Sequence, residues 1–176
     1  MKSLGIDLST SATGLVLLES NGTKYPALLR EQSLSYPKLK GIARNKAIST
    51  DIMMLIHAHY PEKIVLEGYS LNMKKASSVI PLIEIGGLLR FLMHIDGLEW
   101  YDPTAPEVKK FATGKGNAPK ETMMMLVLKR WNHTSIDNNT ADAYVCAAMG
   151  LSISNKLPGV TQDMRAITGK LAVVEN

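Results

Sequence analysis

The first third of the chain changes from the short hydrophobic runs of strands to the spacing of a helix. Apolar runs cover residues 2–7, 14–19 and 24–33, and the turn-forming stretches STSAT and SNG separate them. Connections this short predict an antiparallel meander of three strands. From Pro37 to His59 the apolar residues recur instead at helical spacing, which predicts one long helix.

Beyond residue 59, strand patterns and helix patterns alternate. The stretches KIVLEGY (63–69) and LEWYDP (98–103) predict two further strands. Helical spacing predicts helices over residues 74–94, 107–112, 119–131 and 138–155. A meander followed by this alternation predicts an α/β fold, in which a mixed five-stranded sheet carries helices on both faces.

The length and composition of the chain indicate one globular unit. Its 176 residues suit a single domain, and 45% hydrophobic with 20% charged residues is a globular composition. The sequence contains no internal repeat and no low-complexity tract. We predict one domain over residues 1–155, followed by a C-terminal tail of unknown role over residues 156–176.

Charge and cysteine content indicate the compartment and the kind of partner. The most apolar stretch, residues 79–95, is interrupted by Glu84 and Arg90, so no membrane span is expected. The absence of an apolar leader near the N-terminus and the single Cys146 predict a reducing, cytoplasmic location. A net charge of +4 with a pI near 9.1 favours an anionic partner, although many basic proteins bind no nucleic acid.

Three acids occupy positions that suit a metal site. Asp7 and Glu67 end predicted strands, where open α/β sheets carry their sites, and Asp142 lies in a largely apolar helix. Three converging acids without matching bases would repel one another, and a divalent cation commonly resolves that repulsion. Two such cations about 4 Å apart can activate water and stabilise the leaving oxygen of a phosphodiester. Each acid taken alone is better explained as a turn cap or a helix start, so the prediction depends on all three.

Five motifs give the chain a family resemblance. In this order and spacing, LGIDLSTSATG, IVLEGY, PEVKKF, GNAPKE and TADAYVCAA resemble the RuvC group of Holliday junction resolvases, which share the ribonuclease H-like fold. The resemblance extends from Met1 to about Asn155. Single motifs are weak, since GID after a strand also opens sugar kinases and actin-like ATPases, but five in order are much more specific.

The resemblance implies a mechanism and a set of partners. Asp7, Glu67 and Asp142 would bind two Mg²⁺ or Mn²⁺ ions in each active site, and Lys109 with Lys120 would lie beside the scissile phosphate. The substrate would be branched DNA, a four-way junction. Because such a junction has twofold symmetry and one chain offers one acidic cluster, the resemblance also implies a homodimer.

One position departs from the family pattern. The family usually has an acid three residues before the last aspartate, where this chain has Asn139, so Asn139 is the candidate for the fourth catalytic and metal-binding position. An asparagine carbonyl can bind Mg²⁺, but it carries no formal charge. Asp137 could instead reach in from the preceding loop, or the amide could be an engineered replacement that lets a nuclease bind DNA uncut. Asp137 and Asp142 are five residues apart and cannot share one face of a regular helix.

Lysines near these motifs are candidates for DNA contacts. The stretch KKFATGKGNAPK forms a predicted loop with flanking helices, and loops commonly carry sites. Lys120 would begin a helix against the preference of the helix dipole unless an anion lies nearby. The lysines that could contact phosphate are Lys74, Lys75, Lys109, Lys110, Lys115 and Lys120. A second basic group, formed by Lys38, Lys40, Arg44 and Lys46, is as well explained by a solvated helix face.

The stretch GYSLNMKK and the helix after it carry two further hypotheses. By the resemblance, an apolar or aromatic residue here props open the junction centre, so Tyr69 and Leu71 are candidates for DNA contact. Packing of Tyr69 under the loop explains that ring equally well. The apolar helix over residues 74–94 is the candidate dimer interface, and it could equally be an interior helix.

The expected function is therefore a structure-specific endonuclease that resolves four-way junctions. A protein that binds junctions without cutting them is the main alternative, and Asn139 is its best support. A flap or fork nuclease of the same fold would differ only in substrate preference. A sugar kinase or actin-like ATPase is a distant alternative, because the second phosphate loop and second related domain of those proteins are not found here.

Overall fold

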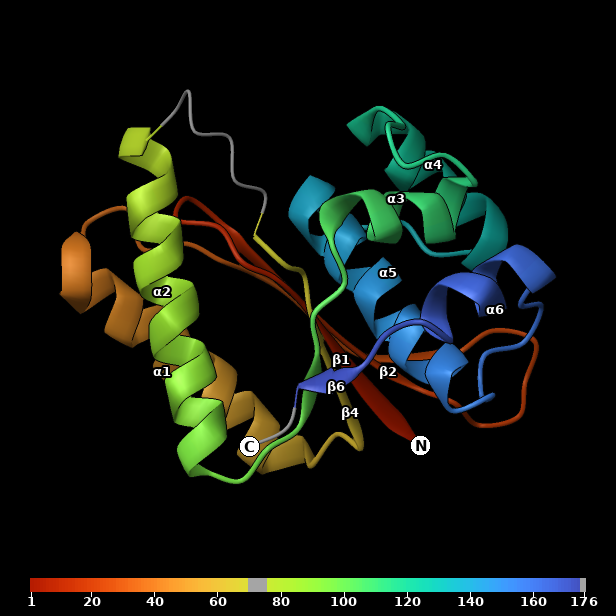
Figure 1. The fold of residues 1–176 in the computed structure, drawn as a ribbon, viewed down its shortest axis with the longest axis horizontal. Helices are drawn as coiled ribbons and strands as arrows, with labels where there is room; N and C mark the ends of the chain where they lie inside the picture. The colour runs from red at the N-terminus through yellow and green to blue at the C-terminus, as the bar shows by residue number, and fades with distance from the viewer. Residues whose placement is uncertain (70–75, 175–176) are drawn as a thin grey trace.

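The computed structural model describes residues 1–69 and 76–174. Three strands come first, and helices then predominate towards the C-terminus; Figure 1 shows their arrangement. In chain order the elements are β1 (Lys2–Asp7), β2 (Thr13–Glu19), β3 (Ala27–Leu34), α1 (Gly41–His59), β4 (Lys63–Leu66), α2 (Ala76–Ile95), β5 (Trp100–Tyr101), α3 (Ala105–Thr113), α4 (Lys120–Trp131), α5 (Asn138–Ile153), α6 (Gln162–Thr168) and β6 (Val173–Val174).

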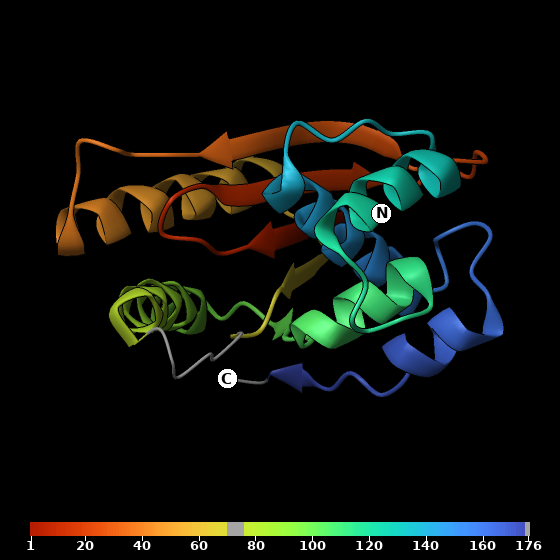
Figure 2. The same ribbon diagram turned by 90° about the horizontal axis from the view of Figure 1, so that it is seen from above.

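One mixed sheet forms the centre of the molecule, with strand order β3-β2-β1-β4-β5-β6. Figure 2 shows the strands in this order from β3 at the top to β6 at the bottom. The three central strands β1, β4 and β5 are parallel, while β2, β3 and β6 pair antiparallel with their neighbours. The carboxyl ends of β1, β4 and β5 therefore meet at one edge of the sheet.

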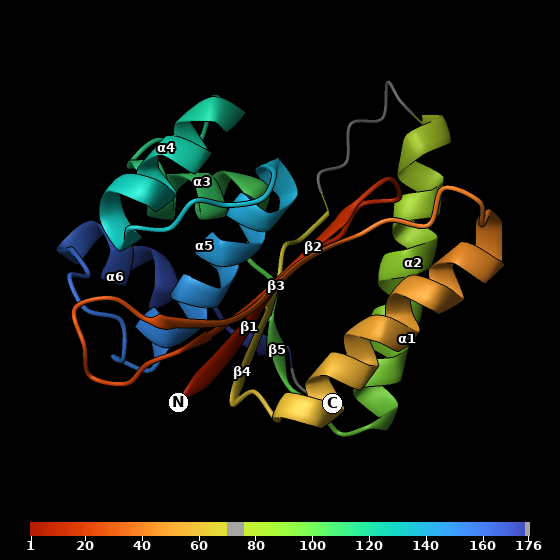
Figure 3. The same cartoon turned by 180° about the vertical axis from the view of Figure 1, so that it is seen from behind.

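Helices cover both faces of this sheet. Helices α1 and α2 lie on one face, and α5 lies on the other with α3, α4 and α6 outside it (Figures 1 and 3). Leu4 and Ile6 of β1 are buried against α1 and α2, so the alternation of a strand points the intervening Gly5 at α5. The expected α/β fold with helices on both faces is confirmed.

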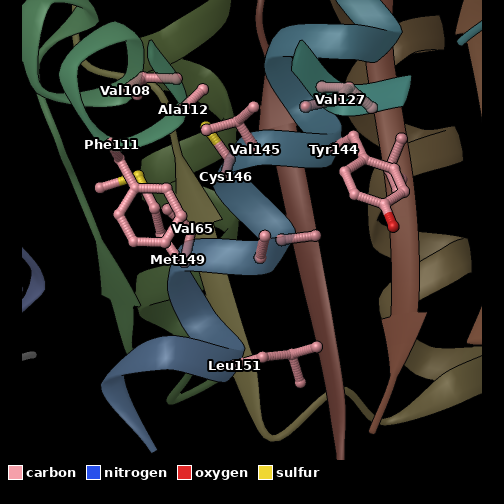
Figure 4. Close-up of a cluster of buried hydrophobic side chains, with 14 of the residues drawn as sticks. Val65, Val108, Phe111, Ala112, Val127, Tyr144, Val145, Cys146, Met149 and Leu151 are labelled. Carbon is pink, nitrogen blue, oxygen red and sulfur yellow. The ribbon is translucent and has the colours of Figure 1, made fainter. Parts of the chain in front are cut away.

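Helix α5 lies directly on the strand backbone. A Cβ added at Gly5 would collide with the carbonyl oxygen of Ala143, and one added at Gly14 would collide with the backbone of Asn139. Residues 140–152 of α5 are all buried, and Figure 4 shows Cys146 and Met149 packed among Val65 and Phe111. Two glycines therefore allow the N-terminal half of α5 to approach the strand ends of β1 and β2.

The structure adds one strand to the expected five. β6 pairs antiparallel with β5, with Tyr101 opposite Val173, and α6 contacts α3 and α5. The residues after 155, expected as a tail of unknown role, thus carry a helix and the edge strand of the sheet. Helix α1 begins at Gly41, after the expected Pro37. None of the described helices has both the length and the apolar character needed to cross a membrane.

Candidate active site

Asp7 and Glu67 lie side by side at the carboxyl edge of the sheet. Asp7 is the last residue of β1, and Glu67 follows the last residue of β4. The parallel register pairs Ile6 with Leu66, and the Glu67 backbone N–H donates to the Ile6 carbonyl oxygen at 2.9 Å. Because Ile6 and Leu66 are buried on the α1 and α2 side, alternation turns Asp7 and Glu67 towards α5.

Asp142 lies on α5, the helix that packs on β1 and β4, and negative charges at this end of the sheet act on the nearby Cys146 thiol. Asp142 is 9% exposed and lies one helical turn before the buried Cys146. Burial raises the pKa of the Cys146 thiol, and the negative charges of Glu67, Asp7 and Asp142 raise it further. The charge of Asp102, which follows β5, acts on the thiol in the same direction.

The space between the strand ends and α2 forms a small pocket. Asp7, Leu8, Glu67, Gly68, Tyr69 and Leu82 line it. Among the residues that the structure describes, no three His, Cys, Asp or Glu side chains are arranged closely enough to enclose a metal ion. The described acids therefore share one end of the sheet without forming a ligand cage. Their chemistry nevertheless fits a divalent cation, because hard cations prefer carboxylate oxygens and neutralise like charges held together.

Asp137 is engaged in capping α5. Its Oδ1 accepts from the Thr140 backbone N–H at 2.8 Å, and its Oδ2 accepts from the Ser33 hydroxyl at 2.6 Å. Burial acts to raise the pKa of Asp137, but the hydrogen bonds from Ser33, Thr140 and the Asn139 backbone outweigh burial and lower it. This engagement argues against the hypothesis that Asp137 reaches into the acidic cluster. Asn139 is half-buried in the first turn of α5, on the same face as Asp142 three residues later.

The loop before α5 is anchored to β3 by residues that sequence reasoning missed. Glu31 accepts from the Ile136 backbone N–H at 3.0 Å, and its other carboxylate oxygen lies 3.2 Å from His133 Nε2. The His133 ring stacks on Tyr144 of α5, with 4.6 Å between ring centroids. No local sequence signal pairs residues so far apart. These contacts hold the start of α5, and therefore Asn139 and Asp142, against the sheet.

We expect Asp137→Ala to lower the free energy of unfolding by about 1–2 kcal/mol at neutral pH, because it removes an N-cap. The folded-state pKa of Asp137 is lowered from 3.8, so its stabilising effect is complete above that value and is lost as pH falls through the folded pKa. Urea unfolding should therefore show a constant difference near neutral pH that shrinks in acid. Asp163→Ala, at an exposed acid of α6, is the control. Equal effects of the two changes would contradict the cap.

The basic residues have different positions relative to the cluster. Lys109 is half-buried and Lys110 exposed on α3, which follows β5 at the acidic edge of the sheet, and Lys115 is exposed in the next loop. Helix α4 begins at Lys120, with Pro119 at the N-cap and no side-chain cap.

The predicted positions Leu71, Lys74 and Lys75 lie outside the described residues. Lys38, Lys40 and Lys46 are exposed around the start of α1, and Arg44 is half-buried there.

The Tyr69 ring packs against α2. This agrees with internal packing, the second of its two explanations, rather than with a DNA contact. Its ring lies 4.4 Å from the Arg90 guanidinium carbon, and its hydroxyl lies 3.4 Å from the Ile83 carbonyl oxygen of α2. Arg90 also pairs with Asp102, which follows β5 at the same sheet edge as Asp7 and Glu67. Sequence reasoning missed Asp102, although its place at the end of a predicted strand resembles that of Glu67.

Comparison with known proteins identifies the family. The family model described as "Crossover junction endodeoxyribonuclease RuvC" matches residues 3–151. The RuvC of Halothermothrix orenii is 28% identical over 143 residues, which cover 80% of this chain and 86% of that protein. The RuvC of Brachyspira hyodysenteriae is 26% identical over 147 residues, covering 84% and 91%.

Solved structures share the fold. Thermus thermophilus RuvC in complex with a Holliday junction substrate matches with a TM-score of 0.70 at 20% identity, over 99% of both chains. The yeast mitochondrial Holliday junction resolvase Ydc2 matches with a TM-score of 0.58 at 12% identity, over 82% of this chain and 75% of that one. These likenesses confirm the ribonuclease H-like fold. Since the family model spans almost the whole domain, the chain belongs to the RuvC family of crossover junction endodeoxyribonucleases.

Proposed function

We propose that this protein is a metal-dependent endonuclease that resolves four-way DNA junctions. The observation that carries the proposal is that Asp7 and Glu67 end two paired parallel strands and Asp142 lies on the helix packed against them, in a chain of the RuvC family. The relatives carry the name crossover junction endodeoxyribonuclease, and the Thermus thermophilus protein was solved with a Holliday junction substrate. Membership of the RuvC family argues against a sugar kinase or an actin-like ATPase.

In this proposal the side chains at this end of the sheet hold two Mg²⁺ or Mn²⁺ ions. Asp7, Glu67 and Asp142 are the charged ligands, and Asn139 adds a neutral carbonyl oxygen on the same face of α5 as Asp142. The metal ions would lower the pKa of a bound water and stabilise charge on the leaving oxygen. The protein supplies the rigid support, because two of the acids stand on strand ends and the third on a buried helix.

The lysines complete the proposed DNA site. Lys109 and Lys120 would stabilise negative charge on the phosphate in the transition state. Lys110, Lys115, Lys74 and Lys75 would bind the sugar-phosphate backbone, which dominates the affinity of most DNA-binding proteins. Because the Tyr69 ring is engaged with α2, we assign the contact at the junction centre to Leu71 instead.

Helix α2 offers the surface for a second copy of the chain. Its outer side exposes large apolar residues, namely Ile80, Ile83, Phe91 and Ile95. Gly87 lies among them with open space above its Cα, so a partner helix can approach closely. A twofold-symmetric substrate needs two active sites, so we propose that this α2 stripe joins two copies in a homodimer.

Phe91→Glu should convert the dimer to a monomer, because a buried unpaired charge opposes association. The variant should still bind junctions through its lysines, but its two nicks should become uncoupled. Light scattering coupled to gel filtration measures the mass, and a supercoiled cruciform plasmid reports whether nicks are paired. Met54→Glu, at an exposed residue of α1, is the control. A Phe91→Glu protein that remains dimeric would exclude the α2 stripe as the interface.

The substrate test compares labelled four-way junctions, forks, flaps and linear duplexes in Mg²⁺ and in Mn²⁺. Symmetric paired nicks, confined to the four-way junction, support a resolvase. Faster cleavage of flaps or forks would favour the nuclease alternative. Tight junction binding with no cleavage in either metal would favour a protein that binds junctions without cutting them, the function that the amide at Asn139 first suggested.

A further inference from the structure

The residue after Glu67 is tied to the next parallel strand. The Gly68 backbone N–H donates to the Pro103 carbonyl oxygen at 2.8 Å. A Cβ at Gly68 would lie 3.2 Å from that oxygen and 3.4 Å from Asp102 Oδ1, so the two segments pack tightly. Glu67 itself is held to β1 through its backbone N–H. The backbone around Glu67 is thus fixed from both neighbouring strands.

Asp102 is held in turn by Arg90 of α2. Arg90 Nη2 donates to Asp102 Oδ1 at 2.9 Å and to Oδ2 at 3.0 Å, and Nε lies 3.3 Å from Oδ2. The remaining terminal nitrogen, Nη1, donates to the Gly86 carbonyl oxygen at 3.2 Å. The two side chains are 17% and 31% exposed, which limits the screening of their charges by solvent. A bidentate pair of this kind fixes orientation as well as distance.

Tyr69 closes the cluster from the other side. Its ring lies under the Arg90 guanidinium, and its hydroxyl donates to the Ile83 carbonyl oxygen. A Cβ at Gly86 would collide with the Tyr69 hydroxyl, so only a glycine at this position lets the ring lie on α2. All three guanidinium nitrogens of Arg90 therefore donate hydrogen bonds within the protein, and one face of the guanidinium packs on Tyr69.

We propose that Arg90, Asp102 and Tyr69 form a positioning cluster that holds Glu67 in the orientation needed to bind metal. The inference rests on the proposed function, in which Glu67 is a ligand. It also links the ligand to α2, since Arg90 belongs to, and Tyr69 contacts, the helix that carries the exposed stripe proposed for dimerisation. Arg90 acts on Glu67 indirectly. It fixes Asp102, and the next residue, Pro103, accepts the hydrogen bond from the Gly68 backbone N–H beside Glu67.

The experiment measures metal binding separately from cleavage. Arg90→Ala should raise the Mn²⁺ concentration for half-maximal cleavage by about tenfold or more, as expected for loss of a residue that orients a metal ligand. Calorimetric titration of Mn²⁺ without DNA should show the same weakening, while metal-free junction affinity stays within about threefold because phosphate contacts supply it. Arg90→Lys keeps the charge but loses the fork and should be intermediate. The control is Arg165→Ala, which removes an exposed hydrogen bond of α6.

Two outcomes would overturn the positioning cluster. One is an Arg90→Ala protein with unchanged metal titrations, and the other is an equal change in the Arg165→Ala control. If Arg90→Ala fails to fold, the same two Mn²⁺ titrations are made on Tyr69→Leu and Arg90→Lys. Unchanged Mn²⁺ titrations in both of these variants would likewise overturn the cluster. A parent protein that binds Mn²⁺ weakly and cuts no junction would refute the proposed function itself, whereas a cleaving parent with unaffected variants refutes only the cluster.

Discussion

Asp7→Asn and Glu67→Gln are each expected to abolish junction cleavage while junction affinity stays within about tenfold of the parent protein. Both substitutions keep the shape of the side chain and remove its charge. The two residues stand at the ends of paired parallel strands, so each amide removes a negative charge from the same proposed metal site. Phosphate contacts by lysines supply most of the affinity, which is why binding persists.

The size of the loss follows from the chemistry. A metal-assisted hydrolysis owes several kcal/mol of transition-state stabilisation to its ions, so the loss of one charged ligand should slow cleavage at least about a thousandfold. Single-turnover cleavage and gel-shift binding of one labelled junction measure the two quantities. Glu99→Gln, at an exposed acid just before β5 and at the opposite end of that strand from Asp102, is the matched control.

Melting curves give a second, independent readout of the same variants. Removing one of three clustered negative charges should raise the melting temperature in the absence of metal, because mutual repulsion decreases. Added Mn²⁺ should stabilise the parent more than either variant, since a ligand stabilises the state that binds it. Cleavage at the parent rate by either variant would remove Asp7 and Glu67 from the metal site.

Asn139→Asp is expected to increase cleavage by about tenfold or more, a change of about 1.4 kcal/mol in the activation barrier. Asn139 lies in the first turn of α5, half-buried and on the same face as Asp142. A carboxylate there is favoured by the positive end of the helix dipole and adds a charged oxygen for the second ion. The gain should be larger in Mg²⁺ than in Mn²⁺, because Mg²⁺ demands a more complete set of oxygen ligands.

The stability of Asn139→Asp should change in the opposite direction from that of Asp7→Asn. A fourth carboxylate near Asp7, Glu67 and Asp142 should lower the melting temperature without metal, and added divalent cation should recover it. Asn138→Asp is a close control, since it adds the same charge to the same helical turn at an exposed neighbouring residue. If the two variants cleave at equal rates and added metal raises both melting temperatures equally, position 139 is not a ligand.

The sequence alone determined the order of the elements and the candidate acids. Hydrophobic periodicity is a local property, so the alternating runs around Asp7 and Glu67 are enough to locate two strand ends. Five motifs in order indicated the family, which the family model confirms. The assignment of Asp7, Glu67, Asn139 and Asp142 as ligands stays a prediction until metal binding is measured.

The tertiary structure decided how these positions are supported, because periodicity tells which face of an element is buried but names no partner. Asp137 is a candidate ligand by sequence, but in the fold its carboxylate accepts from Ser33, 104 residues away in the chain. The sequence explains Tyr69 equally well as a DNA contact or as an internal packing residue. In the fold its ring lies over Gly86 of α2, where any larger side chain would collide with it. The pairing of Arg90 with Asp102 and the addition of β6 to the sheet likewise depend on contacts between distant segments, which only the folded chain brings together.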